Sequence, residues 1–252
     1  KHGGTLALCG SMGNDAVFSN AVDKVNMSTT GNGVDYADLN YSSSQNGAFG
    51  SRTQSVFFGG YTPSMASNSD YVLTASGGTA TAGGALTQAR RGMGAGCSNS
   101  TRGLAMGGYT PAASPTNASN VIDYTTMSAK SAFVDFGDLA TARMWAGGAS
   151  NAIRGLFSSG TPTSNIDYIT IASEGDGITF GTCNQSGGAG SLASSTRALF
   201  GGGYSNTVNA IQYVEIMTLG NSIDFGDLRS RSPFDYIAAA SSTTRGFFMG
   251  SS

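Results

Sequence analysis

The sequence predicts an all-β protein built of short strands. Glycine provides 38 of the 252 residues, and charged residues make up only 11%. Short runs rich in aromatic and β-branched side chains are bounded by Gly, Ser, Thr and Asn, which is the usual pattern of strands and turns. No window of a dozen residues carries the periodicity of an amphipathic helix.

The same series of strands recurs about every 48 residues. One sequence motif occurs as Thr-Arg-Gly-Leu-Ala-Met-Gly-Gly from Thr101 and as Thr-Arg-Ala-Leu-Phe-Gly-Gly-Gly from Thr196. An Asp-Tyr strand follows it, as at 165–171, and then a short Asp-Phe-Gly-Asp-Leu element, as at 135–139. A strand of small residues, such as 146–148, completes the unit. The positions equivalent to the arginine in the six copies of this motif are Gly4, Gln54, Arg102, Arg154, Arg197 and Arg245.

Four antiparallel strands in a unit of this length are typical of one blade of a β-propeller. We therefore predict that residues 1–252 form a single all-β propeller domain with five repeats and one extra strand. Five copies of three of the strands and six copies of the fourth make 21 strands in total. We expect about five four-stranded blades, or six or seven if the chain is incomplete. The extra strand is either displaced or part of an incomplete blade.

Each strand of the unit suits one position in a blade. The small-residue strand suits the innermost position, where blades crowd around the axis and bulky side chains would clash. The Arg-Gly-Leu-Phe strand comes second, and its Leu and Phe side chains are expected to fill the space between neighbouring blades. The Asp-Tyr strand comes third, and the Phe-Gly-Asp strand forms the outer edge.

These repeats resemble kelch repeats, with Phe136, Phe180 and Phe225 in place of the usual outer-strand Trp. More narrowly, they are similar to kelch-like repeats in virion and tail structural proteins of phages that infect marine bacteria and cyanobacteria. The resemblance implies a non-enzymatic virion protein that acts in assembly or host attachment. Its partners would be other virion proteins or a host surface glycan or protein. A secreted lectin or adhesin of a marine microbe and an intracellular kelch adaptor remain as alternatives.

The composition argues against several kinds of chemistry. The only histidine is His2, and the three cysteines, Cys9, Cys97 and Cys183, have no CxxC spacing. A His-based catalytic triad or a His/Cys metal cluster is therefore not expected, and neither is a cofactor. The formal net charge of −2 argues against general nucleic-acid binding. No apolar run approaches 18 residues, so no membrane insertion is expected.

Two sets of repeated charged residues have competing interpretations. The repeated arginines (Arg102, Arg154, Arg197 and Arg245) lie at the turn between the first and second strands. They would either form a ring for an anionic ligand or, as we favour, donate to turn carbonyls of their own or the next blade. The repeated aspartates would either bind Ca²⁺ or, as we favour, cap turn amides. They lie in the Asp-Tyr strand (Asp23, Asp70, Asp123 and Asp167) and in the outer strand (Asp38, Asp138 and Asp227).

The loop between the second and third strands varies in length and is our candidate for recognition. It carries Tyr61, Tyr109 and Tyr204 among Ser, Thr, Asn and Pro. Aromatic side chains with short polar neighbours suit a sugar or a protein partner, although loop length also drifts without function. Because strands alternate in direction, these loops should share a face with the loops between the fourth and first strands. The repeated arginines should then lie on the opposite face.

Overall fold

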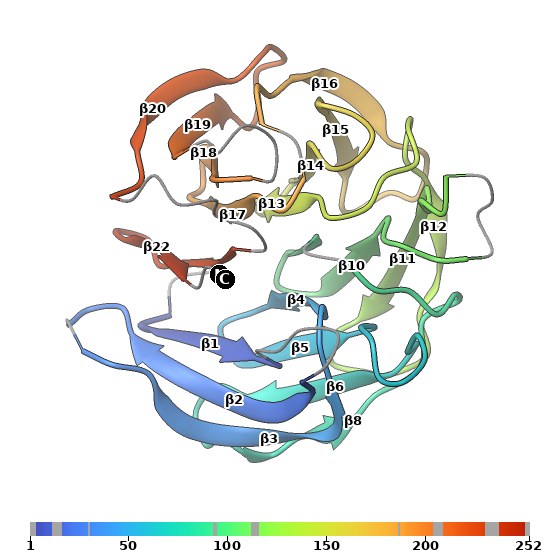
Figure 1. The fold of residues 1–252 in the computed structure, drawn as a ribbon, viewed down its shortest axis with the longest axis vertical. Coiled ribbons are helices and arrows are strands. Elements are labelled where there is room, and N and C mark those ends of the chain that lie inside the picture. Colours follow the sequence, from blue (N-terminus) through green and yellow to red (C-terminus); the bar gives the residue numbers. More distant parts are fainter. Residues whose placement is uncertain are drawn as a thin grey trace.

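The computed structural model describes residues 4–11, 17–29, 31–92, 95–111, 116–185, 187–203, 209–229 and 237–249. Over these residues the chain is all-β and contains no helix, and hence none that is long and apolar enough to cross a membrane. The strands form five four-stranded sheets and one two-stranded sheet. Figure 1 shows these sheets arranged around a common centre.

The strands occupy four positions, numbered from the centre outward. First-position strands are β4 (Gly47–Gly50), β9 (Gly96–Ser98), β13 (Gly147–Ser150), β17 (Gly190–Ala193) and β21 (Ala238–Ser241). Second-position strands are β1 (Leu6–Gly10), β5 (Gln54–Phe58), β10 (Arg102–Met106), β14 (Arg154–Ser158), β18 (Arg197–Gly201) and β22 (Gly246–Met249). Third-position strands are β2 (Ser19–Asn26), β6 (Ser69–Leu73), β11 (Val121–Thr126), β15 (Asn165–Thr170) and β19 (Ala210–Glu215). Fourth-position strands are β3 (Val34–Ser43), β8 (Thr81–Ala82), β12 (Val134–Asp138), β16 (Ile178–Thr182) and β20 (Ile223–Asp227).

We number the sheets along the chain. Sheet 1 is β1-β2-β3 with β7 (Gly78–Thr79), sheet 2 is β4-β5-β6-β8, sheet 3 is β9 to β12, sheet 4 is β13 to β16, sheet 5 is β17 to β20, and sheet 6 is β21-β22. In sheets 2 to 5 the strands run from first to fourth position, as predicted. Sheet 1 has no first-position strand among the described residues and carries β7 beside β3, in the one parallel pair of the described strands. The extra second-position strand, β22, pairs with β21, so it belongs to an incomplete sixth sheet.

Small residues line the first-position strands because these strands approach one another closely. A Cβ atom added at Gly148 of β13 would lie 2.7 Å from the Gly96 carbonyl oxygen of β9. Serine side chains link the same strands. The Ser98 Oγ donates to the Gly50 carbonyl at 2.7 Å, and the Ser150 Oγ donates to the Ser98 carbonyl at 2.8 Å. The expectation of Gly and Ala at the innermost position is confirmed.

The hydrophobic core lies between neighbouring sheets. One cluster joins Leu104 of β10 and Phe136 of β12 to Phe157 of the next sheet. A second cluster joins Leu156 and Phe180 of sheet 4 to Phe200 of sheet 5. Side chains of the second and fourth positions therefore bury one another only when the adjacent sheet is present.

Two polar links recur between consecutive sheets. In the side-chain link, the residue at the arginine position of the repeated motif donates to the carbonyl at the end of the next sheet's third strand. Its examples are Gln54 to Met127 at 2.7 Å, Arg102 to Ile171 at 3.2 Å, Arg154 to Ile216 at 3.2 Å and Arg245 to Met27 at 3.4 Å. In the loop link, the amide just before a fourth strand donates to the outer edge of the preceding sheet. Its examples are Ala80 to Asp38 at 2.8 Å, Phe133 to Ala85 at 2.9 Å, Gly177 to Asp138 at 2.7 Å and Ser222 to Thr182 at 2.8 Å.

A stack of Arg, Tyr and Phe also repeats within sheets 3, 4 and 5. The Arg guanidinium lies over a third-position Tyr ring, and a fourth-position Phe meets the same ring edge-on. The stacks are Arg102-Tyr124-Phe136, Arg154-Tyr168-Phe180 and Arg197-Tyr213-Phe225. Cation–π and edge-to-face contacts of this kind each stabilise a structure by roughly 0.5–1.5 kcal/mol.

Candidate functional site

Two of the predicted tyrosines meet around an arginine. The Arg91 Cζ lies 4.5 Å from the Tyr61 ring centroid and 5.0 Å from the Tyr109 ring centroid. Tyr61 comes from the loop between β5 and β6, and Tyr109 comes from the loop between β10 and β11. Two of the candidate loops, from neighbouring sheets, thus converge on one guanidinium. Tyr204, the third predicted residue, lies outside the described residues.

Backbone pairing fixes both tyrosines in place. The Tyr61 amide and carbonyl both bond Ser44, each at 2.8 Å, in the loop that leads into β4. Tyr109 is paired in the same way with Arg91, in the loop that leads into β9. Gly60 and Gly108, with φ of 103° and 111°, turn the chain from the second strand into each tyrosine. The loops between the second and third strands and the loops between the fourth and first strands therefore share one end of the sheets, as predicted.

Two further aromatic residues extend this site. The Phe18 ring centroid, in sheet 1, lies 5.8 Å from that of Tyr61. Trp145 precedes β13 and has a φ of 54°, and its amide donates to the Gly92 carbonyl at 2.8 Å. A Cβ atom added at Gly92 would lie 2.5 Å from the Trp145 Nε1, so the indole packs directly over this glycine. All five side chains of the resulting aromatic surface are partly exposed (Phe18, Tyr61, Arg91, Tyr109 and Trp145).

The repeated arginines lie at the other end of the sheets. Arg102 opens β10, whereas Tyr109 follows the far end of the same strand. The expected hydrogen bonds to next-sheet carbonyls are confirmed for Arg102, Arg154 and Arg245. Arg197 instead pairs with Glu215 of its own sheet, with Nε and Oε1 2.6 Å apart. These arginines serve the contacts between and within sheets.

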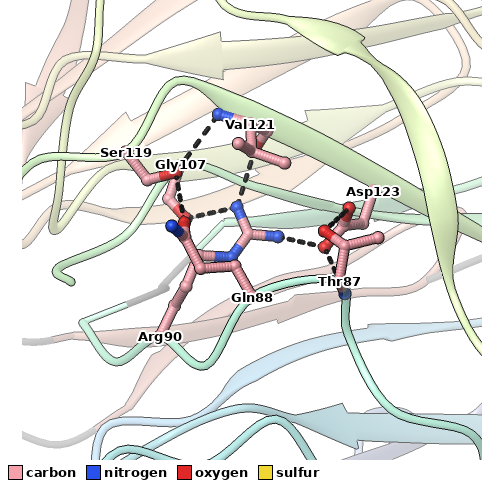
Figure 2. A network of polar contacts seen from close by, with 7 residues as sticks. All are labelled: Thr87, Gln88, Arg90, Gly107, Ser119, Val121 and Asp123. Atoms are coloured by element: carbon pink, nitrogen blue, oxygen red, sulfur yellow. Dashed lines mark hydrogen bonds and ion pairs between the residues drawn. The ribbon is translucent and has the colours of Figure 1, made fainter. Parts of the chain in front are cut away.

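A buried ion pair in sheet 3 was not anticipated from the sequence. Figure 2 shows the Arg90 guanidinium pointing toward the Gly107 and Val121 carbonyls and the Asp123 carboxylate. The Arg90 Nη2 lies 2.6 Å from the Asp123 Oδ2, and both side chains are fully buried. Thr87 donates to the same carboxylate at 2.5 Å. Burial lowers the pKa of Arg90 and raises that of Asp123, and the opposite charge of each partner counteracts both shifts.

Sheet 4 repeats this ion pair. The Arg143 Nη2 lies 2.5 Å from the Asp167 Oδ2, and the Arg143 Nη1 donates to the Asn165 carbonyl at 2.6 Å. The predicted capping of turn amides holds for both aspartates in addition to the ion pairs, since Asp123 accepts from the Thr87 amide at 3.3 Å and Asp167 accepts from the Ala140 and Thr141 amides. Asp70 instead accepts from the amide of Asn40 within β3, at 2.7 Å.

A sequence signal for these pairs exists in hindsight. An Ala-Arg dipeptide precedes the small-residue strand in two repeats, at 89–90 and at 142–143. Since their side chains are sealed from solvent, these ion pairs offer no access to a substrate.

Among the described residues, no group of three or more His, Cys, Asp or Glu side chains is arranged to hold a metal ion. Cys97 and Cys183 are buried. Burial, with a smaller contribution from Asp23, raises the pKa of the Cys9 thiol to about 11, so this thiol is protonated at neutral pH.

A scan against protein-family models matches no family, and a search of curated proteins finds no match.

Proposed function

We propose that this protein is a kelch-like β-propeller that serves a phage particle as a non-catalytic binding and assembly module. The arrangement of sheets around one centre and the links that recur between neighbours support the propeller. The resemblance of the repeats to kelch-like repeats of phage virion proteins supports a role in a phage particle. Host attachment through the aromatic surface is the specific role that we assign to the module.

The observation that carries this role is the position of Arg91 between the rings of Tyr61 and Tyr109. Aromatic rings stack on the apolar faces of sugars, and a guanidinium binds carboxylate or sulfate groups. Ring stacking also orients the guanidinium before a ligand arrives, which lowers the entropy cost of binding. An acidic surface glycan therefore fits this surface better than a neutral one.

Binding of the purified protein to an array of acidic and neutral glycans tests the role. We expect retention on acidic glycans, and Tyr61→Ala and Tyr109→Ala should each weaken it at least about tenfold. Tyr124→Ala is the matched control, because Arg102 stacks on Tyr124 at 4.7 Å at the other end of the sheets. Equal losses in all three variants, or no binding to any acidic glycan, would refute the assignment.

Location distinguishes the phage protein from a secreted lectin, since both would use the same surface. Mass spectrometry of purified phage particles should detect the protein at a fixed number of copies per particle. Detection only as free protein in the medium would favour the lectin.

A further inference from the structure

The aromatic surface draws on four consecutive sheets. Phe18 directly precedes β2 of sheet 1, Tyr61 follows β5 of sheet 2, Tyr109 follows β10 of sheet 3, and Trp145 lies in the loop that leads into β13 of sheet 4. Figure 1 shows these four sheets as neighbours around the centre. The surface is therefore a band that crosses several loops, which is longer than a single sugar unit needs.

In sheet 4 the aromatic residue comes from a different loop. Thr161 stands at the position of the two tyrosines and pairs with Met144. Trp145, the residue after Met144, supplies a ring instead. Its amide donates to the Gly92 carbonyl at 2.8 Å, and its carbonyl accepts from the Gly188 amide at 2.6 Å. Hydrogen bonds to the loops of both neighbouring sheets thus hold the backbone of Trp145 in place.

The charge of this surface lies in the middle of the band. Toward sheet 1, the Tyr61 ring centroid is 4.5 Å from the Arg91 Cζ, and the Phe18 centroid is 5.8 Å from that of Tyr61. On the other side are the Tyr109 ring, 5.0 Å from the Arg91 Cζ, and then Trp145 of sheet 4. Each step is close to the size of one sugar ring, so a sugar bound at Arg91 has stacking positions for a neighbour at both of its ends.

The rings on either side of Arg91 favour uncharged sugar units. A guanidinium donates to a carboxylate in a planar, bidentate arrangement. The faces of aromatic rings carry the negative part of the ring quadrupole, so they repel a carboxylate placed over them, whereas the C–H groups of a neutral sugar ring pack well there. The best ligand therefore carries its acid on one unit and has neutral units on both sides of it.

We propose that the aromatic surface binds an internal segment of a linear polysaccharide, with one uronic-acid unit on Arg91 and a neutral unit on each side. Tyr61 and Phe18 hold the neutral unit at one end, and Tyr109 and Trp145 hold the one at the other end. A terminal acidic sugar would leave the rings on one side of Arg91 empty. The inference rests on the proposed function and adds to it the length of the glycan and the spacing of its charges.

Hyaluronan fragments of increasing length test the proposal, because glucuronic acid alternates with neutral N-acetylglucosamine in this polymer. Trp145 is the only tryptophan of the chain, so its fluorescence reports binding at that end of the surface. We expect the hexasaccharide to change the Trp145 emission and to bind at least about tenfold more tightly than free glucuronic acid. The neutral N-acetylglucosamine hexamer and the fully acidic galacturonic acid hexamer should each bind at least about tenfold more weakly than the hyaluronan hexasaccharide.

Substitutions at the two ends of the band separate its flanks from its centre. Phe18→Ala and Trp145→Ala should each weaken hexasaccharide binding at least about threefold and leave the affinity for glucuronic acid unchanged, as measured by isothermal titration calorimetry. Phe18→Ala alone decides the outcome if Trp145→Ala does not fold. Tyr168→Ala is the matched control, because it removes a ring 4.4 Å from the Arg154 Cζ at the other end of the sheets. Its affinity for both ligands should be that of the unsubstituted chain.

Several results would overturn this inference and leave the proposed glycan binding intact. They are equal affinity for glucuronic acid and the hexasaccharide, binding of either other hexamer as tightly as the hyaluronan hexasaccharide, and unchanged hexasaccharide affinity in the folded end variants. Failure to bind hyaluronan fragments, while other acidic glycans are retained on the array, would do the same. Absence of binding to every acidic glycan would refute the proposed function together with the inference.

Discussion

Two of the Arg-Tyr-Phe stacks have nearly the same geometry and very different surroundings. The ring centroids of Tyr168 and Phe180 are 6.1 Å apart at 78°, and those of Tyr213 and Phe225 are 6.1 Å apart at 76°. Phe180 is nevertheless buried and Phe225 exposed. The geometry of the stack is thus set within one sheet, whereas its burial depends on the loop of the next sheet.

The arginines of the same two stacks differ in the same way. Arg154 donates to the Ile216 carbonyl of the next sheet, and Arg197 pairs with Glu215 of its own sheet. The same repeat residue therefore joins two sheets where the next sheet has a described third strand, and it makes an exposed ion pair where the described residues include none. The chain stabilises each sheet largely through its neighbour.

The largest expected effect contrasts the buried Arg90–Asp123 ion pair with the exposed Arg197–Glu215 pair of sheet 5. Asp123→Ala leaves the Arg90 guanidinium buried without its counter-charge and should lower the free energy of unfolding by about 3–5 kcal/mol. Glu215→Ala removes the carboxylate from an exposed pair and should cost less than about 1 kcal/mol. Urea denaturation of both variants measures the difference. Similar losses would mean that the Arg90 pair is not sealed from water.

The second contrast compares the two phenylalanines directly. Phe180→Ala opens a cavity between sheets 4 and 5 and should cost about 3–5 kcal/mol in unfolding free energy. Phe225→Ala loses chiefly its edge contact with Tyr213 and should cost about 1 kcal/mol. Equal destabilisation in urea melts would contradict the exposure of Phe225.

The smallest contrast uses two glycines with nearly the same φ. Gly137 and Gly226 have φ values of 145° and 144°, so alanine is strained equally at both. Only at Gly137 would the new Cβ also meet the next sheet, at Gly175. Gly137→Ala should therefore be less stable than Gly226→Ala by about 1–3 kcal/mol. Thermal unfolding of the pair gives this difference, and a value near zero would place both glycines in open space.

Much of this architecture was predictable from the repeat. The strand order, the 21 expected strands and the innermost Gly and Ala residues follow from local composition, and the structure adds only β7 to them. The Arg90–Asp123 pair was not predicted, because its partners lie 33 residues apart and the arginine precedes the strand that opens sheet 3. The aromatic surface was predicted in part. Tyr61 and Tyr109 were chosen individually, but the part played by Arg91 depends on how neighbouring sheets meet.

Amide hydrogen exchange at Gly33 and Gly177 tests most directly whether contacts with the neighbouring sheet stabilise each sheet. Both amides directly precede a fourth strand, but only Gly177 donates to a carbonyl of the preceding sheet, that of Asp138. In the chain alone, Gly177 should exchange at least about 100-fold more slowly than Gly33. Comparable protection of the two amides would show that the hydrogen bond to the preceding sheet does not protect Gly177 and would contradict the account.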